Sequence, residues 1–145
     1  MLEAYYDGSC NPINPGGHGT WGAWIRDAHT LEVLQTLKGY CGHGKLISNN
    51  VAEYAGMIGA LEWLLREGHA GTPIVVHGDS MLTIMQVTKR WKAKSGLYLP
   101  YYKRAMELIP MFEDINFQWI PRRDNATADE LSRVELKARG IKERW

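Results

Sequence analysis

The sequence predicts an α/β fold: a single five-stranded mixed sheet, three antiparallel strands followed by parallel ones, with helices on both faces. Three observations predict it. Residues 2–40 hold three extended stretches that are joined by short links. From Asn50 the apolar period changes to three and four residues, which is typical of a helix. Short apolar runs then alternate with helical patterns to the end of the chain, which is typical of parallel strands with crossover helices.

The three predicted antiparallel strands are "LEAYYDG" (2–8), "TWGAWIRD" (20–27) and "LEVLQTLKGY" (31–40). Apolar, β-branched and aromatic residues alternate in them with polar ones. The links are the loop "NPINPGGHG" (11–19) and a tight turn near residues 27–30. Links this short favour antiparallel neighbours.

The first predicted helix covers residues 50–66. Ser48 or Asn49 is its natural cap and Gly68 its natural stop. Its apolar positions recur at helical spacing: Val51, Tyr54, Ala55, Ile58, Leu61, Leu64 and Leu65.

The second half of the chain alternates strands and helices. A buried strand, "TPIVVHGD" (72–79), precedes a helix, "SMLTIMQVTKRW" (80–91), that Ser80 caps. After a break at 92–100, a helix follows over 101–112, which Pro110 ends or kinks. The last elements are a strand at 115–120, a loop at 121–125 and a helix at 126–139.

Length and composition indicate one globular domain over residues 1–145. The chain is 45% hydrophobic and 23% charged. No apolar run approaches the ~20 residues of a membrane span, and the N-terminus lacks the features of a secretion signal. We therefore expect a cytoplasmic protein without membrane contact, and a monomer.

The net charge of +1 conceals two unequal halves. Residues 1–88 carry a formal charge of −4, and residues 89–145 carry +5. Such a chain can bind metal in one place and a polyanion in another, although solvated helix faces explain the charges equally well. The basic tail at about 140–145 has three arrangements open to it: it extends the last helix, contacts nucleic acid or frays.

Four acids stand at or near element boundaries that this topology can bring to one end of the sheet: Asp7, Glu53, Asp79 and Asp129. Singly, each has an ordinary explanation as a turn residue, a cap or a helix-dipole partner. Two carboxylates ~4 Å apart repel by roughly 4 kcal/mol at an effective dielectric of about 20. Convergence of all four therefore requires protons or bound cations, and hard divalent ions such as Mg²⁺ prefer oxygen ligands.

Four blocks of the sequence, each with one acid, carry a family resemblance: "YYDGSCNPINPGGHG", "SNNVAEYAGMIGALEWL", "VVHGDS" and "FQWIPRRDNATADELSR". In order and spacing they resemble the type 1 ribonuclease H family over essentially the whole chain. The resemblance implies a ribonuclease H-like fold in which Asp7, Glu53, Asp79 and Asp129 are catalytic and hold two Mg²⁺ ions, with Mn²⁺ as a candidate substitute. It implies endonucleolytic hydrolysis of the RNA strand of an RNA–DNA hybrid by a two-metal in-line mechanism, leaving 5′-phosphate and 3′-hydroxyl ends.

The resemblance also implies substrate contacts, which it assigns to Gly8, Asn14, Ser48, Asn49, Asn50 and Trp91. Helix capping is the alternative role for the Ser-Asn-Asn run, and a core position is the alternative for Trp91. The loop before Asp129 lacks the histidine of many bacterial members. Either Arg122 or Arg123 contacts phosphate there, or that assistance is absent.

Two other functions compete with a hybrid-specific ribonuclease. One is another nuclease or strand-transfer enzyme of the same superfamily, against which the Ser-Asn-Asn run and the Trp91 cluster argue. The other is a catalytically silent nucleic-acid-binding module, against which the presence of all four acids argues.

Overall fold

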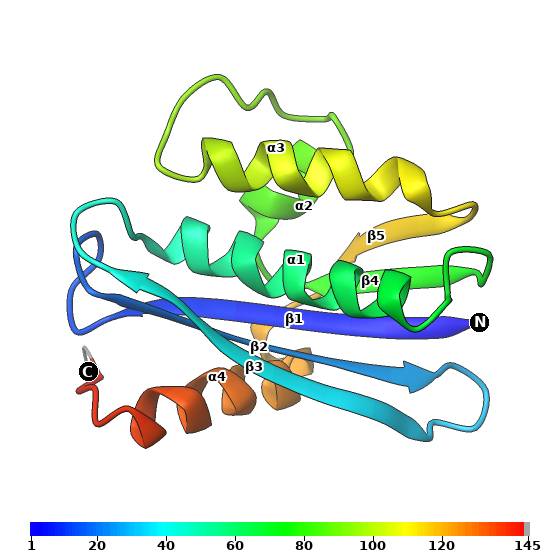
Figure 1. Ribbon diagram of the computed structural model, residues 1–145, viewed down its shortest axis with the longest axis horizontal. Coiled ribbons are helices and arrows are strands. Elements are labelled where there is room, and N and C mark those ends of the chain that lie inside the picture. Colours follow the sequence, from blue (N-terminus) through cyan, green and yellow to red (C-terminus); the bar gives the residue numbers. More distant parts are fainter. Residues whose placement is uncertain (144–145) are drawn as a thin grey trace.

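The computed structural model describes residues 1–143 and contains one five-stranded sheet (Figure 1). Its order is β3-β2-β1-β4-β5, in which β1–β2 and β2–β3 are antiparallel while β1–β4 and β4–β5 are parallel. This confirms the predicted mixed sheet. The strands are β1 (Leu2–Asn11), β2 (His18–Asp27), β3 (Val33–His43), β4 (Ile74–Gly78) and β5 (Ile115–Trp119).

Helices cover both faces of the sheet, as predicted. Figure 1 shows α1, α2 and α3 on one side and α4 on the other. Within residues 1–143, none of the helices is long and apolar enough to cross a membrane. The helices are α1 (Asn49–Arg66), α2 (Met81–Val87), α3 (Leu99–Leu108) and α4 (Ala126–Ala138), with 3₁₀ turns at Ile109–Met111 and Arg122–Asp124.

One helix end differs from the sequence-based expectation, and the end expected at Pro110 is confirmed. Helix α2 stops at Val87, because Lys89 takes a left-handed backbone conformation (φ 62°) that reverses the chain. The N–H groups of Lys89 and Arg90 then donate to the last free carbonyls of the helix. Helix α3 ends before Pro110, whose missing N–H allows only a 3₁₀ turn to follow.

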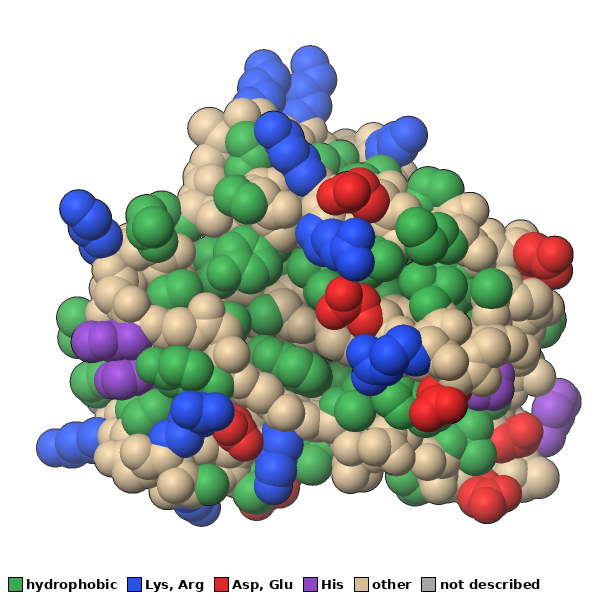
Figure 2. Space-filling model, in the orientation of Figure 1, with side chains coloured by type: hydrophobic (Ala, Val, Ile, Leu, Met, Phe, Trp, Pro, Cys, Tyr) green, Lys and Arg blue, Asp and Glu red, His purple; other side chains and the backbone are tan. Residues whose placement is uncertain are grey.

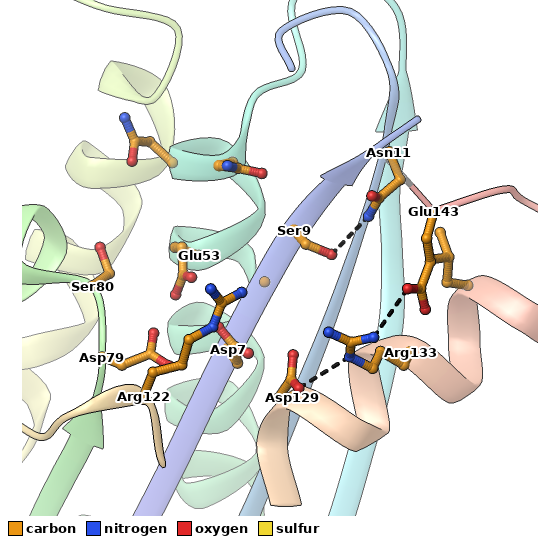
Figure 3. A pocket seen from close by; sticks show the side chains of 14 residues that line it. Asp7, Ser9, Asn11, Glu53, Asp79, Ser80, Arg122, Asp129, Arg133 and Glu143 are labelled. Carbon is orange, nitrogen blue, oxygen red and sulfur yellow. Dashed lines mark hydrogen bonds and ion pairs between the residues drawn. The ribbon is translucent and has the colours of Figure 1, made fainter. Parts of the chain in front are cut away.

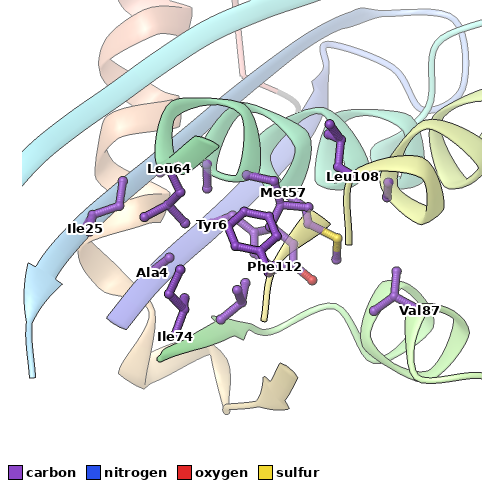
Figure 4. Close-up of a cluster of buried hydrophobic side chains, with 14 of the residues drawn as sticks. Ala4, Tyr6, Ile25, Met57, Leu64, Ile74, Val87, Leu108 and Phe112 are labelled. Carbon is purple, nitrogen blue, oxygen red and sulfur yellow. The ribbon is translucent and has the colours of Figure 1, made fainter. Parts of the chain in front are cut away.

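The main core lies between the sheet and helices α1, α2 and α3 (Figure 4). Alternate residues of β1, Ala4 and Tyr6, point into it and are fully buried. Two buried hydrogen bonds cross this core, one between β1 and α2 and the other between α1 and α2. The Tyr6 hydroxyl lies 2.6 Å from Thr83 Oγ1, and the Tyr54 hydroxyl donates to Gln86 Oε1 at 2.6 Å.

The opposite sheet face carries a small ring stack at the start of β1. Tyr5 stacks on both Trp24 and His77. His77, which lies in the strand just before Asp79, is buried and lies 2.9 Å from the Glu3 carboxylate. Burial lowers the pKa of His77, although Glu3 opposes that shift. These contacts explain His77 as part of the packing.

We expect the change Tyr54→Phe to lower the free energy of unfolding by about 1–2 kcal/mol, because Gln86 Oε1 is then left buried without its donor. Urea denaturation measures the loss. Tyr102→Phe is the control, since that ring packs against Tyr54 without taking part in the bond. An equal loss in both variants would show that the hydrogen bond does not matter.

Candidate active site

A pocket of about 280 Å³ opens beside the second half of β1 and the end of β4 (Figure 3). The sequence placed the end of the first strand at Gly8, but β1 continues to Asn11 because its last residues also pair with β2, so Asp7 lies within the strand. The parallel register explains the position of the pocket. β1 and β4 pair Tyr6 with Gly78, so that the next residues, Asp7 and Asp79, emerge side by side. Helix α1 supplies Glu53 from above the sheet, and α4 supplies Asp129 from below it.

All four predicted acids line this pocket, and three of them form a close cluster. Asp7, Glu53 and Asp79 each offer a carboxylate oxygen, and these oxygens all lie within 4.8 Å of one another. Asp7 is only 6% exposed and Glu53 only 8%. The sequence-based expectation that the four acids converge on one site is therefore correct, and Asp7, Glu53 and Asp79 are the three that come closest together.

A glycine allows Glu53 to come this close to β1. A Cβ placed on Gly8 would lie 2.6 Å from the Glu53 nitrogen and would also overlap the Ala52 backbone. Ser48 fixes the start of α1, since its Oγ accepts the Val51 N–H at 3.2 Å. The predicted role of Ser48 as a helix cap is therefore confirmed.

The cluster holds protons more tightly than isolated carboxyls do. Burial raises the pKa of Asp7 to about 7, and the charges of Asp79 and Asp129 act in the same direction. Burial and the neighbouring Asp7 raise the pKa of Glu53 well above its usual value. The pKa of Asp79 is also raised by burial, against the opposing effects of Asn125 and Arg122.

The donor set fits a hard divalent cation. Glu53 Oε2 is buried and has no hydrogen-bond partner among the described residues, so one acceptor faces the pocket unused. Three carboxylates at close range with such an acceptor match the oxygen ligands that Mg²⁺ and Mn²⁺ prefer. Asp7, Glu53 and Asp79 are the residues that would hold the ion.

Two residues that the sequence analysis missed hold Asp79 in place. Asn125 is buried and donates to both Tyr6 O (2.9 Å) and Asp79 Oδ2 (3.3 Å). The Trp119 indole N–H donates to the Asp79 carbonyl at 3.1 Å. An Asn just before a predicted helix indicates a cap, and its side chain makes no such bond here. No sequence signal therefore pointed to the bond with Asp79.

Asp129 lines the same pocket but does not belong to the cluster of three. Its Oδ2 accepts from Arg133 Nε at 3.0 Å, and Arg133 Nη1 donates in turn to Glu143 Oε2 at 3.0 Å. Figure 3 shows this chain of ion pairs on the side of the pocket nearest α4. The i,i+4 spacing of Asp129 and Arg133 is the signal that could have identified the first pair.

The start of α1 forms another side of the pocket. Asn49 and Asn50 line it, whereas Asn14 and Ser48 do not. Asn14 Oδ1 accepts the Asn49 N–H at 2.9 Å, and Asn49 Oδ1 accepts the Cys10 N–H at 2.8 Å. Asn14 thus ties the loop after β1 to the first turn of α1.

The predicted cationic and aromatic contacts divide into two groups. Arg122 lines the pocket, and its charge lowers the pKa of Asp79. Arg123 and Trp91 do not line it. Trp91 is 45% exposed on the segment after α2, and Figure 2 shows Lys and Arg side chains gathered above that segment at the top of the view.

The sheet order and the carboxylates beside β1 and β4 define a protein of the ribonuclease H fold. A family model described as reverse transcriptase-like matches residues 5–134, and the chain belongs to that family. The resemblance to type 1 ribonucleases H is confirmed by its relatives.

Three relatives illustrate the similarity. The N-terminal RNase H domain of rv2228c from Mycobacterium tuberculosis is 34% identical with a TM-score of 0.83, and the match covers 94% of each chain. RNase H1 from the archaeon Halobacterium salinarum is 28% identical with a TM-score of 0.83, over 94% of this chain and 98% of that one. LC11-RNase H1 in complex with an RNA/DNA hybrid is 30% identical with a TM-score of 0.76, over 92% and 95%.

The full-length curated relative is much longer than this chain. The bifunctional protein Rv2228c of M. tuberculosis is 37% identical over 125 residues, which are 86% of this chain and 33% of the relative. The chain thus spans about a third of that protein.

We expect the metal-free protein to lose stability as the pH rises from about 4 to about 7. A carboxyl whose pKa is higher in the folded than in the unfolded state binds an extra proton in the folded state between those values. Asp7→Asn removes that group, so at pH 8 in EDTA the variant should be more stable than the parent by on the order of 2 kcal/mol.

Urea denaturation at pH 5 and pH 8 measures this difference, which should shrink at pH 5 and when Mg²⁺ replaces EDTA. Asp114→Asn is the control, because that carboxylate is exposed and lies outside the pocket. A parent protein whose stability in EDTA is the same at both pH values would contradict the expectation.

Proposed function

We propose that this chain hydrolyses the RNA strand of RNA–DNA hybrids in a metal-dependent, endonucleolytic reaction, leaving 5′-phosphate and 3′-hydroxyl ends. The observation that carries the proposal is the close cluster of Asp7, Glu53 and Asp79, in which Asp7 and Glu53 are buried and Asp79 is half-buried. The relatives support it, since one is named Ribonuclease HI and another is a type 1 enzyme in complex with an RNA/DNA hybrid. We propose residues 1–145 as a single catalytic domain. The monomeric state and the cytoplasmic location stay predictions.

Asp7, Glu53 and Asp79 are the proposed ligands of the first divalent ion, and Asp129 joins them for the second. When bound, a pair of divalent ions supplies a water of lowered pKa and stabilises charge on the leaving oxygen. The protein's part is to hold the carboxylates at fixed positions. For Asp79, Asn125 holds the side-chain carboxylate and Trp119 holds the backbone carbonyl.

The substrate contacts follow from the pocket walls. Arg122 lines the pocket and forms no ion pair with another of the described residues, so it suits a phosphate beside the reacting one. Asn49, Asn50 and the backbone at Gly8 lie on the side of α1, where a polar group can sense a 2′-hydroxyl. We propose Asn14 and Ser48 as residues that brace this wall.

The DNA strand is proposed to run over the basic segment after α2. Trp91 is exposed there, and Lys89, Arg90, Lys92 and Lys94 are exposed around it. An aromatic ring among cations suits a nucleic-acid backbone and its bases. Arg123, exposed beside Arg122, is a further candidate for a phosphate contact.

We expect Asp79→Asn to abolish cleavage of a labelled RNA–DNA hybrid while leaving the fold intact, because an amide cannot replace a charged ligand oxygen. The loss should exceed a hundredfold, and circular dichroism checks the fold. Asp114→Asn is the control, since Asp114 is exposed and lies outside the pocket. Full activity of Asp79→Asn would refute the assignment.

The substrate assay separates the three functions. The parent protein is incubated with RNA–DNA hybrid, RNA duplex and DNA duplex, each with Mg²⁺ and with chelator. Cleavage of the hybrid's RNA alone, lost with chelator, supports the proposal. Cleavage of DNA indicates another nuclease of the superfamily, and binding without cleavage indicates a silent module.

We expect Trp91→Ala to raise the KM for the hybrid at least about fivefold and to change kcat less, because base stacking contributes about 1–3 kcal/mol. Steady-state kinetics at fixed salt measure both constants. Met111→Ala, which removes an exposed apolar side chain elsewhere, is the control. An unchanged KM would exclude Trp91 from substrate binding.

A further inference from the structure

The C-terminal segment after α4 reaches back to the candidate active site. Glu143 lines the pocket together with Asp129 and Arg133. Arg133 bridges the other two residues, with 3.0 Å from its Nε to Asp129 Oδ2 and 3.0 Å from its Nη1 to Glu143 Oε2 (Figure 3). One guanidinium therefore joins the fourth predicted metal ligand to the segment after α4.

The end of α4 gives this segment its direction. Gly140 adopts a left-handed conformation (φ 70°), and its N–H donates to Lys137 O at 3.0 Å. The Ile141 N–H donates to Leu136 O at 3.1 Å. These two bonds make a Schellman motif, which reverses the chain at the helix end. The reversal brings Glu143 alongside Arg133, ten residues earlier in the sequence.

Asp129 is the acid that stands outside the close cluster, and its observed partner is Arg133. To bind a cation together with Asp7, Asp129 must weaken its hold on Arg133. Because Arg133 also pairs with Glu143, its positive charge is shared between two carboxylates. The pair with Glu143 also holds the Arg133 guanidinium from the side away from Asp129. Without Glu143, the whole charge of Arg133 would face Asp129 and the neighbouring acids.

We propose that Glu143 is a positioning residue that acts through Arg133 to keep Asp129 available to a divalent ion. The inference rests on the proposed function, since it concerns the same metal site. Glu143 lies outside the four sequence blocks that carry the predicted acids. The proposal therefore makes the segment after α4 part of the metal site.

The sign of the effect follows from the charges. Glu143→Gln should weaken Mg²⁺ binding to the free protein about two- to fivefold, the range that corresponds to partly exposed ion pairs. Arg133→Gln should strengthen Mg²⁺ binding by a similar factor, because Asp129 is released and a positive charge leaves the pocket wall. Isothermal titration calorimetry with Mg²⁺, without substrate, measures both.

A double-mutant cycle distinguishes positioning from a simple loss of negative charge. If Glu143 acts through Arg133, adding Glu143→Gln to the Arg133→Gln variant leaves Mg²⁺ affinity unchanged. If Glu143 only contributes its own charge, the same weakening appears in both backgrounds, and the proposal is overturned. The matched control is Glu135→Gln, which breaks the Glu135–Arg139 pair of the same helix outside the pocket.

The proposal and the proposed function fail in different ways. If the parent protein binds Mg²⁺ and cleaves the hybrid but Glu143→Gln binds Mg²⁺ as the parent does, the positioning role is wrong and the activity stands. If the parent protein cleaves no hybrid yet the double-mutant cycle shows coupling, the activity is wrong and the positioning role stands. Thermal unfolding of each variant shows whether the fold is kept.

Discussion

Mutual repulsion among three clustered carboxylates is the constraint on which the rest of the structure depends. Asp7, Glu53 and Asp79 lie within 4.8 Å of one another in a largely buried site, where each charge costs more than it does in water. The fold tolerates this arrangement because its core lies elsewhere. The main apolar cluster between the sheet and helices α1–α3 stabilises the fold and offsets the unfavourable free energy of the acidic site.

Three features of the backbone bring the acids together, and each fixes one of them. The parallel register of β1 and β4 sets Asp7 beside Asp79. Gly8 lets α1 approach β1, which places Glu53 over them. Asn125 joins the carbonyl of Tyr6 to the carboxylate of Asp79, and so connects the loop before α4 to both strands. The site is therefore rigid before any ion or substrate arrives, as precise chemistry requires.

The charges of the chain are arranged in space as well as in sequence. The acidic first half contributes Asp7, Glu53 and Asp79 to the pocket, and the basic second half surrounds it with Arg122 and Arg133. The exposed cations after α2 extend this positive region away from the pocket. A cation site next to a basic surface suits a substrate that is itself a polyanion, because the ion and the surface neutralise different phosphates.

The sequence by itself determined the element order, the mixed sheet and the identity of the clustered acids, because apolar periodicity and short sequence blocks are local properties of the chain. It did not determine where the first strand ends, since β1 continues past Asp7 to Asn11. Only the tertiary structure decided that Asp129 stands apart with Arg133 and Glu143, and that Asn125 and Trp119 hold Asp79. It also decided that Asn14 and Ser48 brace the pocket rather than line it. The bonds of Asp79 with Asn125 and Trp119 join residues 46 and 40 positions apart, so local spacing carries no sign of them. The Asp129–Arg133 pair has a local spacing, but only the structure shows that it lies at the pocket.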